Sequence, residues 1–336
     1  MLFPNENVVI APAVDHDSDA WHLRRANSVG ASEIGMALGV SKYGGLLDLI
    51  LAKRDLLAGK IERFDNDAMA AGRDAEATIL KLARRKLDLD TNHEMAPGEL
   101  LTFGNASATP DAVVIDAAGR VVATVEAKLD RARNDWQAVI DNGFGGLEAG
   151  DTRLLYFWQV QAQLHVSGCK VGYLAVWQVW AFYLIKIEAD AHAAAAIVAA
   201  SNAAMAWVND SLQRLPAATD ADTLAALART IKPAADDTLT VEGEVAAALE
   251  SYGQASAAIK ALELQQDAAK RIILAAHADA AKLQTASGFK SSFVAASTRN
   301  GIDTAKLTTE LPDIAAAYQK TTSISAGCRI TSPKVK

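Results

Sequence analysis

The sequence contains only two cysteines, Cys169 and Cys328, among its 336 residues. Two thiols provide neither a disulfide framework nor a four-cysteine zinc site, so we expect both to be reduced and to take no part in the chemistry. The sequence also has no run of eighteen apolar residues, and its N-terminal region lacks a basic segment ahead of a short apolar stretch. These absences argue against a transmembrane helix and a signal peptide, and a cytoplasmic protein without membrane attachment is expected.

The charge balance is acidic, with a formal net charge of −7. This excess argues against a polyanionic partner, because non-specific DNA affinity comes from Lys and Arg that replace counterions. Basic positions are nevertheless grouped locally. One group of four lies in residues 314–336, which contain no acid. A second group, in the N-terminal region, consists of Arg24, Arg25, Lys53 and Arg54. The net charge therefore does not exclude a local surface for nucleic acid.

Periodicity predicts an α/β core with a mixed central sheet, because helices and strands alternate along the first two thirds of the chain. A helix capped by Ser32 is expected near that residue, with Glu33 in its first turn. The further predicted helices are 44–59, 67–87 and 152–167, and the predicted strands are 99–107, 111–116, 121–129, 171–177 and 181–187.

Beyond residue 190 the composition becomes rich in alanine, and a long helix is predicted in the C-terminal part. Apolar and small residues in this helix recur three and four apart, which indicates either packing as a helical hairpin or a face for a partner or a second copy. The last fifty residues are read as a short β element, a helix at 303–319 and a terminal strand or tail. The predicted organisation is a leader at 1–20, the α/β core domain at 21–210, a linker at 211–240, a long helix or helical hairpin at 241–286 and a small α/β tail at 287–336.

The segment "TPDAVVIDAAGRVVATVEAKLD" places charged residues within two predicted strands. Side chains two apart share a face of a strand, so Glu126 and Lys128 lie together, and Asp111 starts the preceding strand. Two carboxylates at adjacent strand ends can share Mg²⁺, and the Ala127 carbonyl could complete the coordination shell. Lys128 could position or deprotonate an attacking water. The alternative reading of these residues alone is an ion pair on a solvent-exposed face.

Two other segments carry residues that could serve the same site. "GRDAE" places Glu76 on the helix predicted at 67–87, from which its carboxylate could approach the metal. "YFWQVQAQL" places Gln159 and Gln161 on the helix predicted at 152–167, where an amide could hold a water or a phosphate oxygen.

The order of five motifs resembles a known family. "RRANSVGASEIG", "GRDAE", "TPDAVV", "VEAK" and "YFWQVQAQLHVSG" together resemble the YqaJ-type viral recombinases, which include the phage lambda-type alkaline exonucleases of the PD-(D/E)XK nuclease superfamily. The C-terminal segment also resembles the extension found on phage nucleases of this type. The family usually has a glycine after the motif aspartate, where this chain has Ala112.

The resemblance implies a role for each matching position. Asp111 and Glu126, with Glu76 nearby, would bind the metal, and Lys128 would be the catalytic lysine. Gln159 matches the helix glutamine of the family motif, and Gln161 is its neighbour. Arg25 and Ser32 match by their spacing the arginine and serine that bind a DNA 5′-phosphate.

The function expected from this resemblance is a Mg²⁺-dependent exonuclease, with Mn²⁺ as a possible substitute, that degrades double-stranded DNA from 5′ to 3′ in phage-type recombination. An annealing protein for single strands and a homo-oligomer are the partners that the resemblance implies, within the cytoplasm of a bacterial host. Two alternatives remain open at this point. One is an endonuclease of the same fold in repair or restriction, and the other is a DNA-binding or assembly protein without catalysis.

Overall fold

The computed structural model describes residues 1–11, 18–61, 66–89, 92–132, 134–178, 181–231, 240–278 and 281–293. The chain divides into two compact units, Met1–Thr230 and Ile231–Lys336. In chain order, unit 1 contains β1 (Val9–Ile10), α1 (Asp19–Ala26), β2 (Val29–Gly30), the 3₁₀ helix η1 (Ala31–Glu33), α2 (Ile34–Ala37), α3 (Leu46–Leu57), α4 (Asp67–Leu87), β3 (His93–Pro97), β4 (Leu101–Phe103), β5 (Ala106–Ala108), β6 (Ala112–Asp116), β7 (Val121–Leu129), α5 (Trp136–Asn142), α6 (Thr152–Ser167), β8 (Val171–Gln178), β9 (Ala181–Glu188), α7 (Ala191–Val208) and α8 (Leu224–Thr230). Unit 2 contains α9 (Gly243–Ala276), β10 (Lys282–Gln284) and β11 (Lys290–Ser292).

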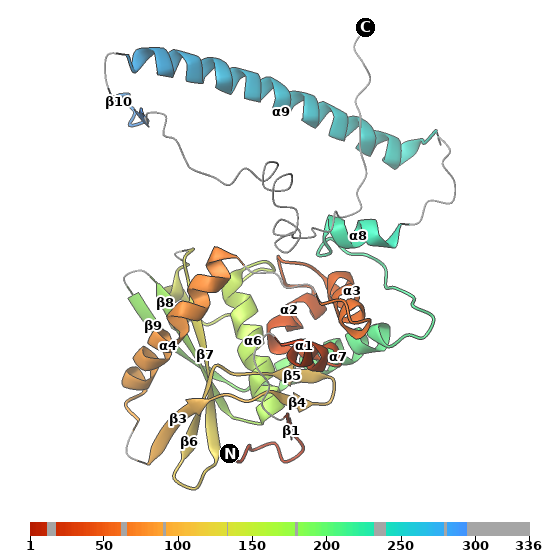
Figure 1. Ribbon diagram of the computed structural model, residues 1–336, viewed down its shortest axis with the longest axis vertical. Coiled ribbons are helices and arrows are strands. Elements are labelled where there is room, and N and C mark those ends of the chain that lie inside the picture. Colours follow the sequence, from red (N-terminus) through yellow and green to blue (C-terminus); the bar gives the residue numbers. More distant parts are fainter. Residues whose placement is uncertain are drawn as a thin grey trace, which may run out of the picture. The chain divides into compact units, whose positions relative to one another are not determined.

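A five-stranded mixed sheet forms the centre of unit 1, with the strand order β3-β6-β7-β8-β9 (Figure 1). Only β7 and β8 run parallel, and α6 is part of the connection between them. The other neighbouring strands are antiparallel. The predicted α/β fold with a mixed central sheet is confirmed, and the C-terminal unit contains the long helix α9.

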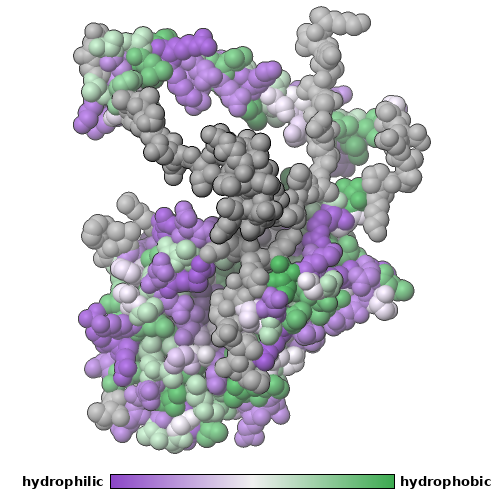
Figure 2. Space-filling view, viewed as in Figure 1, coloured by the Kyte–Doolittle hydropathy of each residue, from purple (hydrophilic) through white to green (hydrophobic). Residues whose placement is uncertain are grey.

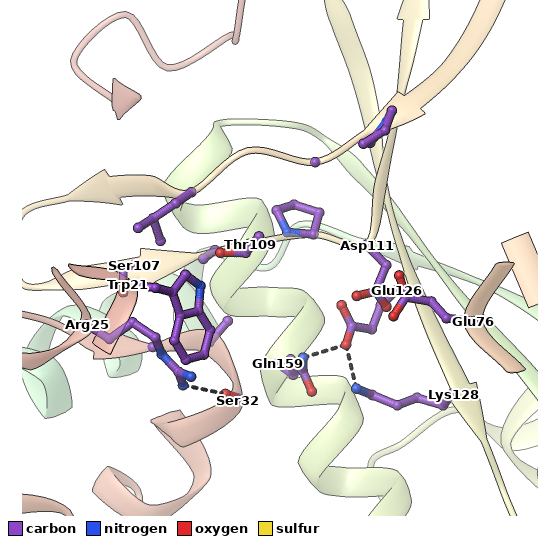
Figure 3. A pocket seen from close by; sticks show the side chains of 17 residues that line it. Trp21, Arg25, Ser32, Glu76, Ser107, Thr109, Asp111, Glu126, Lys128 and Gln159 are labelled. Atoms are coloured by element: carbon purple, nitrogen blue, oxygen red, sulfur yellow. Dashed lines mark hydrogen bonds and ion pairs between the residues drawn. The ribbon is translucent and has the colours of Figure 1, made fainter. Parts of the chain in front are cut away.

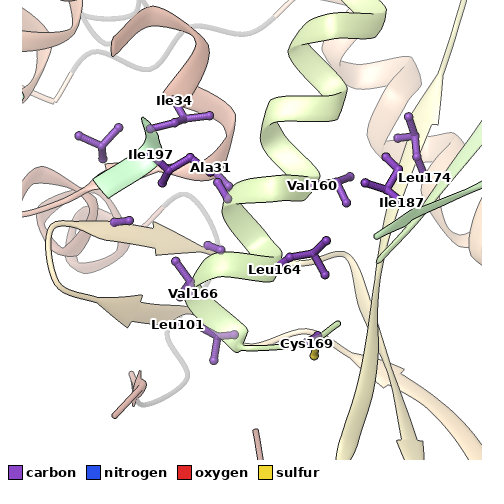
Figure 4. Close-up of a cluster of buried hydrophobic side chains, with 14 of the residues drawn as sticks. Ala31, Ile34, Leu101, Val160, Leu164, Val166, Cys169, Leu174, Ile187 and Ile197 are labelled. Carbon is purple, nitrogen blue, oxygen red and sulfur yellow. The ribbon is translucent and has the colours of Figure 1, made fainter. Parts of the chain in front are cut away.

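The two faces of the sheet are covered by different helices. On one face, Val125 and Ala127 of β7 belong to an apolar cluster with Ile79 and Ala83 of α4. On the other face, α6 lies between the sheet and the N-terminal elements, as Figure 4 shows for Val160. Because both faces are buried, β7 is a central strand of the core, and the alternative of a solvent-exposed face for Glu126 does not hold.

A second, smaller sheet has the order β1-β4-β5-β2 and lies against α6 through β4 and β5. The single strand that we predicted at 99–107 is wrong, because β4 and β5 form an antiparallel hairpin there. The turn between them contains Gly104, whose φ of +59° lies in the left-handed region that glycine adopts without a Cβ clash. Neither β3 nor α5 was among the predicted elements.

The structure also differs from the prediction of a helix with Ser32 as its N-terminal cap. The chain first forms the 3₁₀ turn η1 and then α2, and the cap position is Gly30. The Glu33 carboxylate accepts a hydrogen bond from Gly30 N (2.7 Å), so an acidic side chain satisfies this helix start. Ser32 therefore lies inside the turn, and its hydroxyl does not cap the helix.

The first residues of the chain were predicted as a leader outside the domain, but they pack on it. Phe3 is buried in the core, and the Asn5 side chain donates a hydrogen bond to Val166 O (3.0 Å). Val9 and Ile10 then pair with β4. Residues 1–11 are thus part of the packed unit, because an apolar side chain and a backbone pairing attach them to it.

In unit 2, the single helix predicted at 241–286 is wrong in its extent, because the observed helix α9 ends at Ala276. Residues 282–284 and 290–292 instead form an antiparallel hairpin whose turn includes Gly288, with a φ of +95°. None of the α9 residues is buried, and Figure 2 shows both hydrophobic and hydrophilic side chains on its visible surface. The predicted packing of its apolar seam stays a prediction. The predicted helix at 303–319 and Cys328 lie outside the described residues.

Within the described part of the chain, α7 is the one helix long and apolar enough to cross a membrane. Six of its residues are buried, and it packs on α3 and α6.

Candidate active site

Strand β7 brings two of the predicted site residues to one place. Glu126 and Lys128 are two positions apart and share the face that is directed towards α6. Glu126 is 2% exposed, whereas Lys128 lies nearer the end of the strand and is partly exposed. The Lys128 Nζ lies 2.5 Å from Glu126 Oε1. A buried carboxylate therefore has an ammonium group directly beside it at the mouth of the site.

Asp111 joins this pair from the neighbouring strand, because it immediately precedes β6. Its Oδ2 accepts a hydrogen bond from the backbone N–H of Ala127 (2.7 Å), which lies between Glu126 and Lys128. The backbone at Pro110 and Asp111 is also packed closely from the other side. A Cβ on Gly98 would lie 1.9 Å from Pro110 O, so a glycine is required at position 98. The expected role of the Ala127 carbonyl as a metal ligand stays a prediction.

Two glutamines of α6 orient the Glu126 carboxylate. Gln159 Nε2 donates to Oε1 and Gln163 Nε2 donates to Oε2, each at 2.5 Å. Figure 3 shows Gln159 and Lys128 meeting the same side of Glu126. Gln163 was not among the predicted residues, although its spacing of four from Gln159 places both on one face of the helix. That spacing is the signal by which the sequence could have revealed it.

Gln161, in contrast, does not belong to this site. Its Nε2 donates to Glu188 O (2.8 Å), and its Oε1 accepts from Asp190 N (3.1 Å). Position 161 is two residues from both glutamines, which turns its side chain to the opposite part of the helix surface. The predicted catalytic role of Gln161 is therefore corrected to a structural one, in which it ties α6 to the start of α7.

The electrostatics of the cluster follow from burial and from the crowding of acids. Burial and the Glu126 carboxylate raise the pKa of Asp111 to about 8. Burial would lower the pKa of Lys128, but the Glu126 and Asp111 charges outweigh it and raise this pKa above the ordinary value. Lys128 also lies over the Tyr156 ring, with Nζ 5.2 Å from the centroid. At neutral pH Lys128 is thus an ammonium group that donates hydrogen bonds.

The donor set fits a small hard cation. Within the described residues, no group of three or more His, Cys, Asp or Glu side chains is gathered as for a metal ion. Mg²⁺ is usually held by only one or two carboxylates, with water and substrate phosphate completing its octahedron. Asp111 and Glu126 supply this number, and burial together with the neighbouring Glu126 charge raises the pKa of Asp111. A divalent cation bound between the two carboxylates would offset their mutual repulsion.

A cavity of 430 Å³ connects these residues with the predicted phosphate-binding pair. Its lining includes Asp111, Glu126, Lys128, Glu76 and Gln159, and also Trp21, Arg25 and Ser32. Figure 3 shows Trp21, Arg25 and Ser32 on one side of the cavity and the carboxylates with Lys128 on the other, with Glu76 beyond Asp111. Of the nine predicted site residues, the structure brings all but Gln161 and the untested Ala127 carbonyl to one cavity.

A network of charged residues holds Arg25. Its Nη2 lies 3.4 Å from Ser32 Oγ and 3.4 Å from Glu33 Oε1, and its guanidinium carbon lies 4.4 Å above the Trp21 ring. Lys53, which is 1% exposed, donates to Glu33 Oε2 (2.6 Å) and to Arg25 O (2.5 Å). Burial would raise the pKa of Glu33, but the Lys53 and Arg25 charges lower it on balance. The contacts of Arg25 with Trp21 and Glu33, and of Glu33 with Lys53, were not predicted, because nothing in the spacing of these residues indicates that they meet.

The comparison with protein families agrees with this geometry. Residues 20–170 match the model of the YqaJ-like viral recombinase domain. No curated protein matches the sequence.

Solved structures of exonucleases are similar to part of the chain. LHK-Exo, an alkaline exonuclease from Laribacter hongkongensis, is 22% identical over 57% of this chain and 92% of that protein, with a TM-score of 0.40. LHK-Exo in complex with dAMP is 20% identical over the same shares, with a TM-score of 0.43. A phage-related exonuclease from Haemophilus somnus 129PT is 10% identical over 54% of this chain and 93% of that protein, with a TM-score of 0.42.

The family-model match at residues 20–170 confirms the resemblance predicted from the five motifs. Its model covers the segment that contains Arg25, Glu76, Asp111, Glu126 and Lys128. This match and the cluster of carboxylates and lysine together support a nuclease role. Residues 20–170 of this chain are therefore similar to the YqaJ-like viral recombinase domain.

Proposed function

We propose that this protein is a Mg²⁺-dependent exonuclease that degrades double-stranded DNA from a 5′ end. One observation carries the proposal: a single cavity contains the cluster of Asp111, Glu126 and Lys128 together with a separate pair of hydrogen-bond donors for phosphate, the Arg25 guanidinium and the Ser32 hydroxyl. Cleavage within a strand requires only the cluster of carboxylates and lysine. A second phosphate-binding site beside the carboxylates suits an enzyme that binds the end of a DNA strand and cleaves at a fixed distance from it.

The proposed mechanism gives each residue a distinct task. Asp111 and Glu126 would hold Mg²⁺ or Mn²⁺, with Glu76 nearby, and the bound cation would lower the pKa of water and stabilise charge on the phosphate. Glu126 keeps its orientation through Gln159 and Gln163. The Lys128 ammonium, raised in pKa by the two carboxylates, donates a hydrogen bond to the attacking water or to a phosphate oxygen. The expected products carry 5′-phosphates.

Arg25 and Ser32 would bind the terminal 5′-phosphate. A guanidinium group offers two parallel donors to phosphate, and its contacts with Glu33 and Trp21 limit the orientations that Arg25 can take. Ser32 lies next to it with a hydroxyl that can donate a further hydrogen bond. The pair fixes the terminal nucleotide so that the next phosphodiester lies near Asp111 and Lys128.

The biological setting that we propose is recombination of the phage type in the cytoplasm of a bacterial host. A protein that anneals single strands is the expected partner, because degradation from 5′ ends exposes 3′ single strands. A homo-oligomer is part of the same proposal and rests on the family resemblance.

A digestion assay with defined ends tests the proposed activity. We expect a linear duplex with one labelled end to be degraded in Mg²⁺ and to remain intact in EDTA, and a covalently closed circle to be spared. Cleavage of the closed circle would instead favour an endonuclease of the same fold. Binding of linear duplex without cleavage in Mg²⁺ or Mn²⁺ would favour a protein that has kept the fold and lost catalysis.

A further inference from the structure

A second cavity of 390 Å³ borders the active site on the side of α4. We call it the α4 groove. It shares Glu76 and Asp111 with the cavity described above, and Lys81 and Arg84 contribute positive charge to its lining. Among the residues that the structure describes, neither cation forms an ion pair with an acidic side chain. Positive charge that is not compensated thus lies directly beside the carboxylate cluster.

The spacing along α4 gives the groove a direction. Glu76 and Arg84 are eight residues apart and lie on one face of the helix. At a rise of 1.5 Å per residue, the basic residues extend about 7 to 12 Å from the acidic end. Successive phosphates of a stacked strand are about 3.4 Å apart along the helix axis, so this length corresponds to roughly two to four nucleotides.

The other residues of the groove are suited to a sugar-phosphate chain. Leu80 of α4 and Met95 of β3 provide apolar surface, and the two cations stand on the helix beside them. Deoxyribose and base faces can pack on apolar side chains, while phosphates contact Lys and Arg. A groove lined by acids alone or by apolar residues alone would not accept both parts of a nucleotide.

From this geometry we propose that the α4 groove binds the DNA strand on the 3′ side of the scissile phosphate. The inference rests on the proposed function, in which the 5′-terminal phosphate lies at Arg25. Figure 3 shows Arg25 and Glu76 on opposite sides of Asp111 and Glu126. A strand whose first nucleotide lies at Arg25 and whose scissile phosphate lies at Asp111 must leave on the far side, where the α4 groove begins. Lys81 and Arg84 then contact linkages in the range from the third to the fifth.

The first test measures DNA binding without cleavage. Affinity of a 5′-phosphorylated duplex is measured in EDTA over a range of salt concentrations. For Arg84→Ala we expect affinity to fall roughly threefold or more, and the slope of log K against log salt to decrease by about 0.9, because one phosphate contact is lost. Lys81→Ala should act in the same way, and the double variant should lose about twice as much slope.

A matched control lies on the same helix. Arg85→Ala removes the same charge one residue further on, about 100° around the helix, where the side chain does not line the groove. We expect Arg85→Ala to keep the wild-type slope. Equal losses in Arg84→Ala and Arg85→Ala would overturn the proposal, since the effect would then come from net charge alone. Wild-type affinity and slope in Arg84→Ala would overturn it as well.

The position of the contact is tested with neutral linkages. Duplexes carry a single methylphosphonate at each of the first six linkages from the 5′ end, and each is measured with wild type and Arg84→Ala. We expect wild type to lose affinity at one of linkages three to five and Arg84→Ala to be insensitive there. Sensitivity that is unchanged in Arg84→Ala at every linkage would overturn the assignment.

These measurements separate the groove from the catalytic proposal. If the protein digests DNA in Mg²⁺ but the salt slope of Arg84→Ala equals that of wild type, the groove assignment fails and the nuclease proposal stands. If DNA binding depends on Arg84 but no duplex is cleaved, the α4 groove stands as a DNA-binding surface, while its position relative to a scissile phosphate and the nuclease proposal both fail.

Discussion

Gln163 of α6 donates a hydrogen bond to Glu126 of β7 at 2.5 Å, and both side chains are almost completely buried. A buried carboxylate oxygen that loses its donor keeps the full cost of desolvation, about 1 to 3 kcal/mol or more. We therefore expect Gln163→Leu to lower the free energy of unfolding, measured by denaturant titration, by about 1 to 3 kcal/mol. The loss of orientation at Glu126 should also lower the digestion rate per folded molecule.

Gln161→Leu provides the matched control, because it removes a buried glutamine of the same helix that contacts Glu188 and Asp190 instead. It should destabilise the protein while the digestion rate per folded molecule is kept. A wild-type rate in folded Gln163→Leu would contradict the orienting role.

Lys128→Ala tests the catalytic lysine. Removal of the ammonium beside Glu126 takes away a donor to water and phosphate, and we expect the rate of Mg²⁺-dependent digestion to fall by about 100-fold or more. Lys186→Ala on β9 is the control, because its lysine is exposed and pairs with Glu188 outside the cavity. Near-normal digestion by Lys128→Ala in excess Mg²⁺ would remove Lys128 from the mechanism.

The pKa of Asp111 predicts a dependence of stability on pH. Its folded-state pKa of about 8 lies above the ordinary 3.8, so the folded protein binds this proton more tightly than the unfolded chain. The corresponding stabilisation is complete below the ordinary pKa and is lost as pH rises to about 8. In EDTA, Asp111→Asn should therefore gain stability relative to wild type as pH rises from about 5 to about 8, which thermal unfolding would measure.

Mg²⁺ addition extends the same experiment. A cation that binds the folded form raises its melting temperature by mass action. We expect Mg²⁺ to raise the melting temperature of wild type at pH 8 and to have less effect on Asp111→Asn. Parallel pH profiles of the two proteins in EDTA would contradict the raised pKa of Asp111.

Arg25 predicts a preference for phosphorylated ends. Wild type should digest a 5′-phosphorylated duplex about tenfold faster than a 5′-hydroxyl duplex, since a hydrogen bond to a charged group contributes about 1.5 to 3 kcal/mol. Arg25→Ala should erase most of this ratio. Glu33→Gln should reduce it in part, because Arg25 loses a charged partner at 3.4 Å but keeps Trp21. Equal digestion rates of the 5′-phosphorylated and the 5′-hydroxyl duplex by wild type would contradict the proposed binding of the terminal 5′-phosphate by Arg25.

Gly98→Ala tests the packing behind Asp111. Because the new Cβ would lie 1.9 Å from Pro110 O, the backbone before Asp111 has to move. We expect a loss of digestion activity larger than that of Gly72→Ala on α4, where a Cβ meets nothing within 4 Å. Comparable activities of the two variants would show that the Asp111 backbone tolerates displacement.

The sequence by itself determined the long elements and the residues in register with them. Helices α4 and α6 and strand β7 were predicted with their observed bounds, because their periodicity is long and regular. The pairing of Glu126 with Lys128 follows from the two-residue period of a strand, and the order of short motifs identified the family. These are local properties, which a sequence specifies within one element.

Only the tertiary structure decided which surface of one helix or strand contacts which neighbouring element. The choice between Gln161 and Gln163 depends on which side of α6 meets β7, and a helix rich in apolar residues on all sides does not reveal that side. The buried Lys53 and its contact with Glu33 connect α3 with η1 across twenty residues. The α4 groove requires β3, which was not among the predicted elements, to lie beside α4. Contacts between elements depend on how the whole chain packs, and for that reason spacing within one segment could not predict them.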